Sequence, residues 1–559
     1  MMRLHVRHRR CFLFIVFSFF LLYSLYLLHI IKKSIDHKHS FHYLINKEKI
    51  NLSKSKSRLS QLLKVHEHEH EVKPPTNYEE KRQELRFSID KFWCRIKSKL
   101  QENIDKKDSI PKSSFTELLA VGCQLHNSIL ATFDSMIEED GYQTFREKEA
   151  LDLSSLIQKR LFDLQNPKNC SSNKKLLCNL NIDCGFGCQL HHVVYCLIVA
   201  YGTKRTLLLD TKDWNYGDGA FEKMFEPVSG TCQIPKKYRT KKIKGKRRAS
   251  NDIVNWWPGD KNDEYIKLPR MRDMKKKPDF LPPALPSEFA DRIISFHGDP
   301  VVWWIGQFLK YILRPTQDTM KYLKRNEPNY GDVRHHVGIH IRRTDKLERE
   351  ANFYTLETYM NYVKEYFEYA DLKYINHSKS KPIYIASDDP EVFLESRTKY
   401  PEYTFVGDES RARSASTGAR YNANSLEKLF MDVYMLSKSE FIVCTFSSNL
   451  CRLAYEIQQQ RVSGDNHWRF KSLDDMWQFN IKWNTRVDHH QEAILPHVAS
   501  QTGEMNLNPG DILDVENNMW NGYAKGKNIK NQKTGYYPLY KTKERLKKVE
   551  FPPYESIQT

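Results

Sequence analysis

Short apolar runs separated by helical stretches dominate the chain after Cys170. These runs cover residues 206–209, 337–341, 383–386, 405–406 and 441–446. Continuous runs of this length are typical of strands buried on both faces, as in parallel sheets covered by helices. The pattern extends over more than 300 residues, which is too long for one average domain. The sequence therefore predicts two α/β units, at residues 169–335 and 336–498.

Two adjacent arginines follow one of these predicted strands. The segment reads His340-Ile341-Arg342-Arg343-Thr344-Asp345-Lys346. Paired guanidiniums form a rigid, permanently charged fork that suits a diphosphate. Ligands of open α/β sheets lie beyond the carboxyl ends of the strands, where residues 387–389 and 447–449 also supply polar side chains. The segment predicts a nucleotide-sugar site.

The N-terminus carries an apolar segment behind a basic one. Residues 11–31 contain no acidic or basic side chain except His29, and four arginines precede them within residues 1–10. Roughly twenty apolar residues span a bilayer at about 1.5 Å per residue, and no small-residue cleavage site follows. We expect an uncleaved signal-anchor, with residues 1–10 in the cytoplasm and the body of the chain in a lumen.

The next two regions differ in apolar content. Residues 32–80 are polar and contain too little apolar material for a core, which predicts a stem. Residues 81–168 show a helical period, and the Ser114-x-x-Glu117 capping box predicts the start of a second helix. Amphipathic helices beside a membrane stem often self-associate. We therefore expect a homodimer formed through residues 81–168.

The last region, residues 499–559, differs again. Pro509-Gly510-Asp511, Trp520-Asn521-Gly522 and the run from Thr534 to Pro538 are typical of short strands and tight turns. Their order resembles an SH3 barrel. We expect an SH3-like β-barrel that packs on the rest of the chain, which is favoured over binding of a proline-rich peptide.

The cysteine content and the net charge limit which cellular compartment and which class of ligand the sequence favours. Of the eleven cysteines, one lies in the apolar segment, and the others would face an oxidising lumen. The close pairs Cys184/Cys188 and Cys444/Cys451 predict disulfides, although spacing does not fix the pairing.

The net charge of the chain is +19, and residues 236–248 are strongly basic. A lumenal protein meets no genome, so a solvated loop or a surface for acidic ligands is favoured over nucleic-acid binding.

Several longer motifs occur in an order that resembles the α1,6-fucosyltransferases, the enzymes that add core fucose to N-glycans. The motifs are Cys184 to His192, His297-Gly298-Asp299-Pro300 with Trp303-Trp304, His340 to Lys346, Ser387 to Pro390, and Cys444 to Ser448 with Cys451-Arg452. The resemblance extends from about residue 80 to the end. It implies a Golgi type II membrane enzyme with a GT-B-like fold, whose nucleotide-binding half is Rossmann-type.

The resemblance also implies the reaction. L-Fucose passes from GDP-β-L-fucose to the 6-hydroxyl of the innermost asparagine-linked GlcNAc of N-glycoproteins, by inverting single displacement without a metal or another cofactor. The family's cysteine pattern pairs Cys170–Cys232, Cys178–Cys196, Cys184–Cys188 and Cys444–Cys451. Cys94 and Cys123 are then left either as an intermolecular disulfide or as buried thiols.

Donor residues follow from chemistry and from the resemblance together. Arg342 is expected to bind the β-phosphate and to stabilise the charge on departing GDP, which can replace a metal. Ser447 and Ser448 offer hydroxyls and helix N-terminal amides to the same phosphate, although an ordinary helix cap explains Ser447 equally well. The resemblance adds further donor contacts: Tyr216, Gly185, Gly187, His340, Arg343, Asp345, Tyr359, Asp388 and Asp389. Asp388 and Asp389 also match a metal-binding acidic pair or a helix cap before a proline.

Asp432 lies among apolar residues in the segment 429–434, where an unpaired carboxylate would be costly. Guanine presents N1–H and N2–H2 side by side, and one carboxylate can accept both. The resemblance therefore implies that Asp432 selects guanine. Without the resemblance, a structural ion pair is the favoured interpretation.

Single displacement needs a base to take the proton from the acceptor hydroxyl. The resemblance assigns this role to Glu350, with Lys346 beside it, although a Lys and a Glu four residues apart are more often a surface pair on a helix. It also implies acceptor contacts by Asp273, Asp474 and Glu350.

Several positions depart from the family pattern, and Asp273 stands one place away from the acidic residue expected after Leu268-Pro269. Ile182-Asp183 stands where a lysine–glycine pair is usual, and Met519 stands where a histidine often reaches the glycan. A fucosyltransferase with another acceptor is one alternative, because the arginine motif is shared more widely than core fucosylation, although the helical segment and the SH3-like end argue against it. The changes at Ile182 and Met519 support a second alternative, a catalytically silent Golgi protein that binds glycans or acts as a scaffold. Retention of Arg342 and Glu350 favours the enzyme.

Overall fold

The structure is a computed structural model. It describes residues 73–75, 77–105, 112–217, 219–235, 239–240, 253–270, 273–274, 277–329, 336–344, 352–374, 380–415, 419–461, 468–477 and 489–554. The predicted tail and anchor lie outside these ranges, as do most of the stem and Asp345, Lys346 and Glu350. No helix among the described residues is long and apolar enough to cross a membrane.

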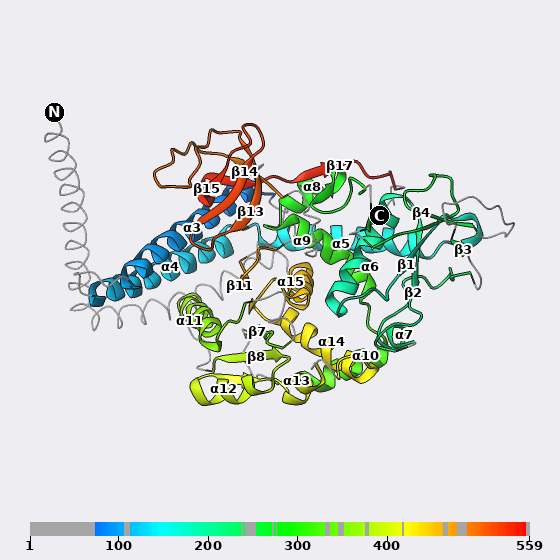
Figure 1. Ribbon diagram of the computed structural model, residues 1–559, viewed down its shortest axis with the longest axis horizontal. Helices are drawn as coiled ribbons and strands as arrows, with labels where there is room; N and C mark the ends of the chain where they lie inside the picture. The colour runs from blue at the N-terminus through cyan, green and yellow to red at the C-terminus, as the bar shows by residue number, and fades with distance from the viewer. Residues whose placement is uncertain are drawn as a thin grey trace, which may run out of the picture. The chain divides into compact units, whose positions relative to one another are not determined.

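A helical hairpin opens the described chain (Figure 1). Helix α3 (Tyr78–Asp105) and helix α4 (Lys112–Glu139) run antiparallel, since Arg86 pairs with Asp134 and Trp93 stacks on His126 with ring centroids 5.7 Å apart. Because α4 is already helical at Lys112, Ser114 lies inside the helix, and the predicted capping box does not start it. Helix α5 (Gln143–Gln165) follows, and its apolar face joins the core of the first α/β unit through Leu153, Ile157 and Leu161.

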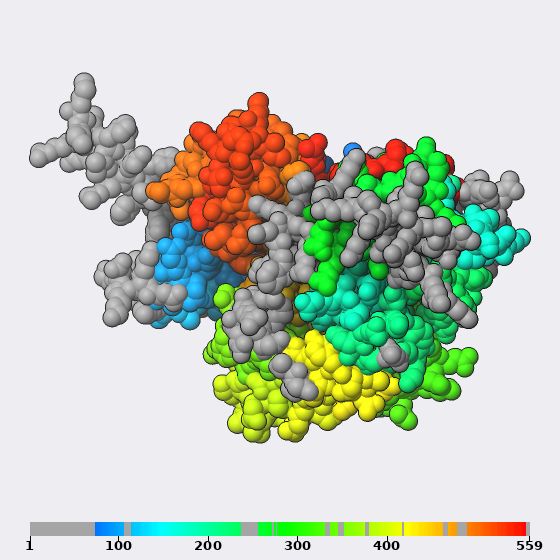
Figure 2. Space-filling view, turned by 45° about the vertical axis from the view of Figure 1, so that its right-hand side comes forward, coloured from blue at the N-terminus to red at the C-terminus, as the bar shows by residue number. Residues whose placement is uncertain are grey.

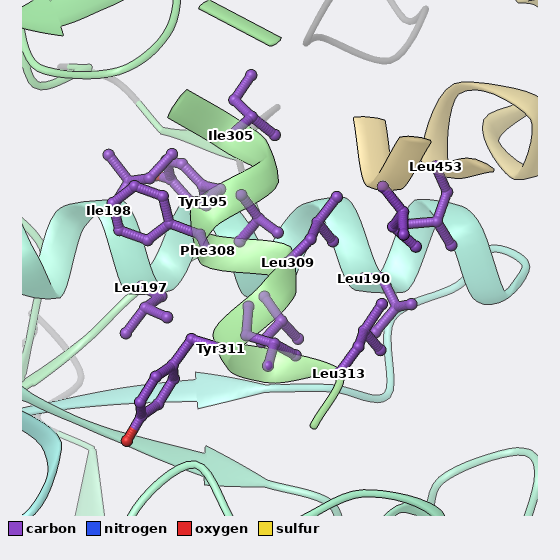
Figure 3. Packing of buried hydrophobic residues seen from close by; sticks show 14 of the residues in the cluster. Leu190, Tyr195, Leu197, Ile198, Ile305, Phe308, Leu309, Tyr311, Leu313 and Leu453 are labelled. Atoms are coloured by element: carbon purple, nitrogen blue, oxygen red, sulfur yellow. The ribbon is translucent and has the colours of Figure 1, made fainter. Parts of the chain in front are cut away.

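The first α/β unit contains a parallel five-stranded sheet in the order β2-β1-β5-β4-β3. Its strands are β1 (Lys175–Asn179), β2 (Thr206–Asp210), β3 (Arg239–Thr240), β4 (Ile253–Trp256) and β5 (Tyr265–Lys267). Its helices include α6 (Phe186–Gly202), α7 (Ala220–Met224), α8 (Ser287–Ile294), α9 (Pro300–Ile312) and α10 (Gln317–Asn326). Helix α9 crosses α6, and Leu190 of α6, Leu309 of α9 and Leu453 of α15 (Asn449–Arg461) belong to one buried apolar cluster (Figure 3).

The second α/β unit contains another parallel five-stranded sheet, in the order β11-β10-β7-β8-β9. Its strands are β7 (Val337–Ile341), β8 (Pro382–Ser387), β9 (Thr404–Val406), β10 (Phe441–Cys444) and β11 (Phe470–Ser472). Its helices are α11 (Leu356–Lys373), α12 (Glu391–Lys399), α13 (Glu409–Ala415), α14 (Ala423–Lys438) and α15 (Asn449–Arg461). Strands β7 to β10 form where the apolar runs predict them. The mixed α/β fold class is thereby confirmed.

The C-terminal region forms an antiparallel five-stranded sheet in the order β15-β14-β13-β12-β16. Its strands are β12 (His490–Ala493), β13 (Ile512–Asn518), β14 (Tyr523–Asn528), β15 (Thr534–Pro538) and β16 (Thr542–Glu544). Strand β12 precedes residue 499, so this sheet begins earlier than the predicted boundary.

The chain then returns to the first α/β unit. Strand β17 (Lys547–Val549) pairs in parallel with β6 (Ala284–Pro286). Beyond it, the ring of Tyr554 stacks on Tyr201 at 4.5 Å, and its hydroxyl donates to the Tyr201 carbonyl oxygen at 2.6 Å. In the space-filling view this red terminal segment lies beside green residues of that unit (Figure 2). The end of the chain is therefore part of the packed fold.

Four disulfides are present, and they join the pairs that the resemblance implies. They link Cys170–Cys232, Cys178–Cys196, Cys184–Cys188 and Cys444–Cys451. Cys94 and Cys123 are free thiols on α3 and α4. Burial raises the pKa of the Cys123 thiol to about 11, with the Glu365 and Glu368 carboxylates adding to the effect. The protonated thiol of Cys123 is therefore favoured at neutral pH, and an intermolecular disulfide through Cys94 or Cys123 stays a prediction.

Candidate active site

Four neighbouring strands of the second sheet end in polar residues at one edge. Along the order β11, β10, β7 and β8, these residues are Asp474, Ser447, Arg342 and Asp388. Because the strands are parallel, their carboxyl ends meet at the same edge, where open α/β sheets bind ligands. We call these four residues the strand edge.

A buried carboxylate fixes the arginine loop. Asp388 binds the guanidinium of Arg342 and the hydroxyl of Thr344. It also accepts the backbone N–H groups of Arg343 at 2.8 Å and of Thr344 at 3.1 Å. Carboxylates that accept several such bonds are strongly anchored. Asp388 therefore holds Arg342 in place at the strand edge.

Arg343 points to a different partner from Arg342. Its guanidinium lies 3.3 Å from Asp389 and 3.1 Å from Glu395 of α12. Asp389 also accepts the backbone N–H of Glu391 at 3.0 Å, which is the helix-capping role considered for this residue. The acidic pair thus shapes the arginine loop, and direct contact of Arg343, Asp388 and Asp389 with a donor stays a prediction.

The backbone amides of the two serines in the predicted phosphate loop have partners within the chain. The backbone N–H of Ser447 donates to Asp474 at 3.3 Å, and that of Ser448 donates to the Thr445 carbonyl oxygen at 3.0 Å. Both amides therefore already have partners within the chain, and phosphate binding by Ser447 and Ser448 stays a prediction. The hydroxyls are the groups that remain, and the Oγ of Ser447 is buried without a hydrogen-bond partner among the described residues.

Several buried polar atoms at this edge lack hydrogen-bond partners within the described part of the chain. Among them are Nδ1 of His340 on β7, Oγ of Ser447 after β10 and Oδ2 of Asp474 after β11, and these three strands are adjacent. Leaving such a group unpaired costs about 1–3 kcal/mol. Burial, reinforced by Arg342, lowers the pKa of His340 to about 4, so its imidazole is neutral near pH 7. The pattern indicates a place where a polar ligand supplies the missing partners.

Two helix N-termini converge beside this edge. Gly185 is the N-cap of α6, and Gly187 lies in the first turn. A Cβ at Gly187 would lie 2.7 Å from the backbone carbonyl of Asn449, the first residue of α15. Helix N-termini carry partial positive charge and attract phosphate. This contact brings the first α/β unit to the strand edge of the second.

The buried ring of Tyr216 confirms that the units meet here. Tyr216 of the first unit packs edge-to-face on Phe186 and on Tyr421, with ring centroids 6.1 and 5.5 Å apart. Burial raises its pKa, and Arg420 and Arg342 are close enough to act against that rise. Burial likewise raises the pKa of Tyr359. The Asp474 carboxylate adds to this rise, and Arg343 acts against it. Tyr216 and Tyr359 are therefore brought near the predicted donor residues, whereas Asp273 lies exposed on a turn.

Asp432 is buried on α14 and already has partners. It accepts the Tyr384 hydroxyl at 2.7 Å and lies 3.1 Å from Nε of Arg411. Burial raises its pKa to about 6, opposed by Arg411. The structure thus shows the ion pair that the sequence alone favours, and guanine binding by Asp432 stays a prediction.

A buried network that the sequence reasoning missed links α6, α15 and the segment after β11. The two carboxylate oxygens of Glu456 bind Nε2 of His191 at 2.9 Å and the indole N–H of Trp477 at 3.1 Å. The sequence contains a sign of this buried carboxylate, because the acidic Glu456 interrupts the apolar run from Leu453 to Ile457.

Cys178, His192 and Cys196 lie close enough together to resemble a metal site. The two sulfurs are joined in a disulfide and cannot act as thiolate ligands. Burial lowers the pKa of His192 to about 4. We interpret this group as part of the core of the first unit.

Comparisons with known proteins identify the class. Residues 25–478 match the family model for the alpha-(1,6)-fucosyltransferase N- and catalytic domains. The chain is 38% identical over 497 residues to the alpha-(1,6)-fucosyltransferase of Drosophila melanogaster, covering 87% of this chain and 76% of that protein. It is 35% identical over 418 residues to the alpha-(1,6)-fucosyltransferase of Caenorhabditis elegans, covering 74% and 71%.

Among solved structures, fucosyltransferase NodZ from Bradyrhizobium is similar with a TM-score of 0.30 and 12% identity, covering 51% of this chain and 92% of that one. The family assignment rests on the family model and on the two sequence relatives. Together with the α/β fold, they define a glycosyltransferase. The chain belongs to the α1,6-fucosyltransferase family, which confirms the resemblance.

Proposed function

We propose that the enzyme transfers L-fucose from GDP-β-L-fucose to the 6-hydroxyl of the innermost asparagine-linked GlcNAc of N-glycoproteins. The observation that carries this proposal is membership of the α1,6-fucosyltransferase family over residues 25–478. The fold is GT-B-like, with the donor held between the two α/β units.

Arg342 is the group proposed to take the place of a metal. Its guanidinium is fixed by Asp388 at the strand edge, beside the N-termini of α6 and α15. A preorganised cation in a site with little water stabilises the negative charge that builds on departing GDP. The Ser447 hydroxyl is a second donor to the same phosphate. Transfer therefore needs no divalent cation.

The acceptor proton is proposed to go to Glu350, with Lys346 tuning its charge. Both residues lie outside the described ranges, and the assignment rests on the family motif that follows Arg343. An amide at position 350 cannot take a proton. Glu350→Gln should therefore stop transfer while leaving GDP affinity within a few fold, and loss of GDP affinity would instead assign Glu350 a structural role.

Asp474 is the acceptor residue best placed for this reaction. It lies at the strand edge next to Ser447, and its Oδ2 is buried without a partner among the described residues. A sugar hydroxyl would satisfy that oxygen. Asp273 is the second proposed acceptor contact.

The cellular setting is proposed from the sequence. Residues 11–31 anchor the enzyme as a single-pass type II protein of the Golgi membrane, and the catalytic part faces the lumen. The C-terminal sheet is an SH3-like barrel. Large apolar side chains are exposed along α3 and α4, which supports homodimerisation through this hairpin. They are Leu85, Phe92, Ile96, Leu118, Val121, Leu125, Ile129 and Met136.

The test uses the lumenal part with GDP-fucose and an N-glycopeptide in EDTA, and the product is mapped by mass spectrometry and linkage analysis. Fucose on O6 of the innermost GlcNAc supports donor, acceptor, linkage and metal independence together. Fucose elsewhere favours another acceptor. GDP binding without any transfer favours the silent glycan-binding or scaffold protein.

A further inference from the structure

Three segments of the chain converge on Asp474. Its carboxylate accepts the backbone N–H of Ser447 at 3.3 Å and the hydroxyl of Ser472 at 3.1 Å. Its backbone carbonyl oxygen accepts the indole N–H of Trp520, which lies between β13 and β14 of the C-terminal sheet. Asp474 thus joins the C-terminal sheet to the loop that follows β10.

The Ser447 loop is held at a second point by the same segment. The backbone N–H of Phe446 donates to the hydroxyl of Ser472 at 3.1 Å, and that hydroxyl donates to Asp474. Both consecutive amides of the loop therefore depend on residues 472–474. A shift of Asp474 would move the Ser447 hydroxyl with it.

The turn that carries Trp520 is itself fixed. Trp520 has a positive φ of 56°, and its backbone N–H donates to Oδ1 of Asn518 at 2.9 Å. The ammonium group of Lys471 lies 4.7 Å from the centroid of the Trp520 ring, a cation–π geometry. A Cβ at Gly522 would lie 3.0 Å from the Lys91 carbonyl oxygen, so the turn packs tightly on α3.

We infer that Trp520 is a positioning residue, which holds Asp474 and, through it, the Ser447 hydroxyl at the strand edge. The inference rests on the proposed function for its kinetic consequence. Oγ of Ser447 and Oδ2 of Asp474, which have no hydrogen-bond partner among the residues that the structure describes, lie on either side of the hydrogen bond that Trp520 supports. The C-terminal sheet thereby sets the geometry of both the donor and the acceptor side of the reaction.

Catalytic geometry is sensitive to small displacements, and a misplacement of about 1 Å can cost on the order of 100-fold in rate. We expect the loss of one supporting hydrogen bond to move Asp474 by less than this, and the effect on the rate to be smaller. A group that acts on the leaving phosphate counts most in the transition state. We therefore expect kcat to fall more than the affinity for GDP.

The test compares Trp520→Phe with Tyr537→Phe. Trp520→Phe removes the indole N–H and keeps an aromatic ring near Lys471. Tyr537→Phe removes a buried hydrogen bond in the same sheet, from the Tyr537 hydroxyl to Gln491 at 3.0 Å, without touching Asp474. We expect kcat to fall about 10-fold in Trp520→Phe and less than twofold in Tyr537→Phe, per folded enzyme.

A double-mutant cycle with Ser447→Ala separates positioning from general loosening. In the Ser447→Ala background, Trp520→Phe should lower kcat by only about threefold, because the Ser447 hydroxyl is gone and the Asp474 carboxylate is the one group left for Trp520 to position. Wild-type kcat in Trp520→Phe, or the same 10-fold loss in both backgrounds, would overturn the inference.

GDP affinity, measured in parallel, keeps this inference separate from the proposed function. A wild-type chain that binds GDP without transferring fucose contradicts the proposed function only. In that case Trp520→Phe and Ser447→Ala should each weaken GDP binding a few fold, and the double variant no further. Unchanged GDP affinity in Trp520→Phe would then overturn the inference.

Discussion

Gly187 of α6 lies directly against the backbone of Asn449, the first residue of α15, and this contact joins the two α/β units where their helix N-termini meet. Any Cβ at position 187 would lie 2.7 Å from the Asn449 carbonyl carbon and oxygen. The closeness of the two helix ends therefore depends on the absence of a side chain at this position.

Gly187→Ala should separate the helix ends. Overpacking of this kind costs about 1–3 kcal/mol, and GDP affinity should fall with it because two helix dipoles move away from the phosphates. Thermal unfolding and calorimetric titration with GDP measure both effects. Gly185→Ala is the stability control, since a Cβ there meets nothing within 4 Å. An equally stable Gly187→Ala would contradict the tight contact.

Arg342→Ala should abolish transfer and weaken GDP binding. The lost charge-assisted contact is worth roughly 2–4 kcal/mol in the transition state. Initial rates with GDP-fucose and titration with GDP provide the two numbers. Arg397→Ala serves as the matched control, because Arg397 is an exposed arginine paired with Glu409 at 3.4 Å. Near-normal turnover of Arg342→Ala would reject the phosphate role.

Asp432 should make stability depend on pH in a defined direction. Burial raises its pKa from the ordinary 3.8 to about 6, so folding favours the protonated form. The protonated carboxyl contributes on the order of 3 kcal/mol to the free energy of unfolding. This contribution is fully present below about pH 4 and is lost as the pH rises through 6.

Urea unfolding between pH 4 and 7 compares the wild type with Asp432→Asn, which cannot titrate. The difference in free energy of unfolding, wild type minus variant, should fall as the pH rises across that interval. Parallel curves would show that Asp432 is not the titrating group. In the same variant, weaker GDP binding with less discrimination against UDP would support the guanine role.

The exposed apolar residues of α3 and α4 should mediate self-association. Phe92 is 66% and Leu125 is 60% exposed on the described chain. Phe92→Glu combined with Leu125→Glu should convert a dimer into a folded monomer, because charge replaces apolar contact. Sedimentation measures the mass. Phe162→Glu, at a 57% exposed residue of α5, should stay dimeric. A monomeric wild type would contradict the proposal.

Most of the second α/β unit could be predicted from the sequence, because buried parallel strands such as Val337–Ile341 appear as continuous apolar runs. Strand β11 could not, since its three residues include Lys471 and carry no such signal. The start of α4 was misplaced because a capping-box pattern also occurs inside a helix. Local sequence does not show which backbone groups are already paired.

The sequence predicted which candidate residues lie together, and it did not predict their contacts. Arg342, Asp388 and Ser447 were expected beyond strand ends, and the parallel sheet brings them to one edge. That the Ser447 amide binds Asp474, and that Glu456 joins two helices, depends on residues far apart in the chain. No periodicity or motif spacing carries that information.

The most direct test of the structural account is a crystal structure of the lumenal part with GDP, grown in EDTA. The account predicts the β-phosphate within hydrogen-bond distance of the Arg342 guanidinium and the Ser447 hydroxyl, with guanine directed toward Asp432. A diphosphate bound away from the strand edge, or bound there with Arg342 making no contact, would contradict it.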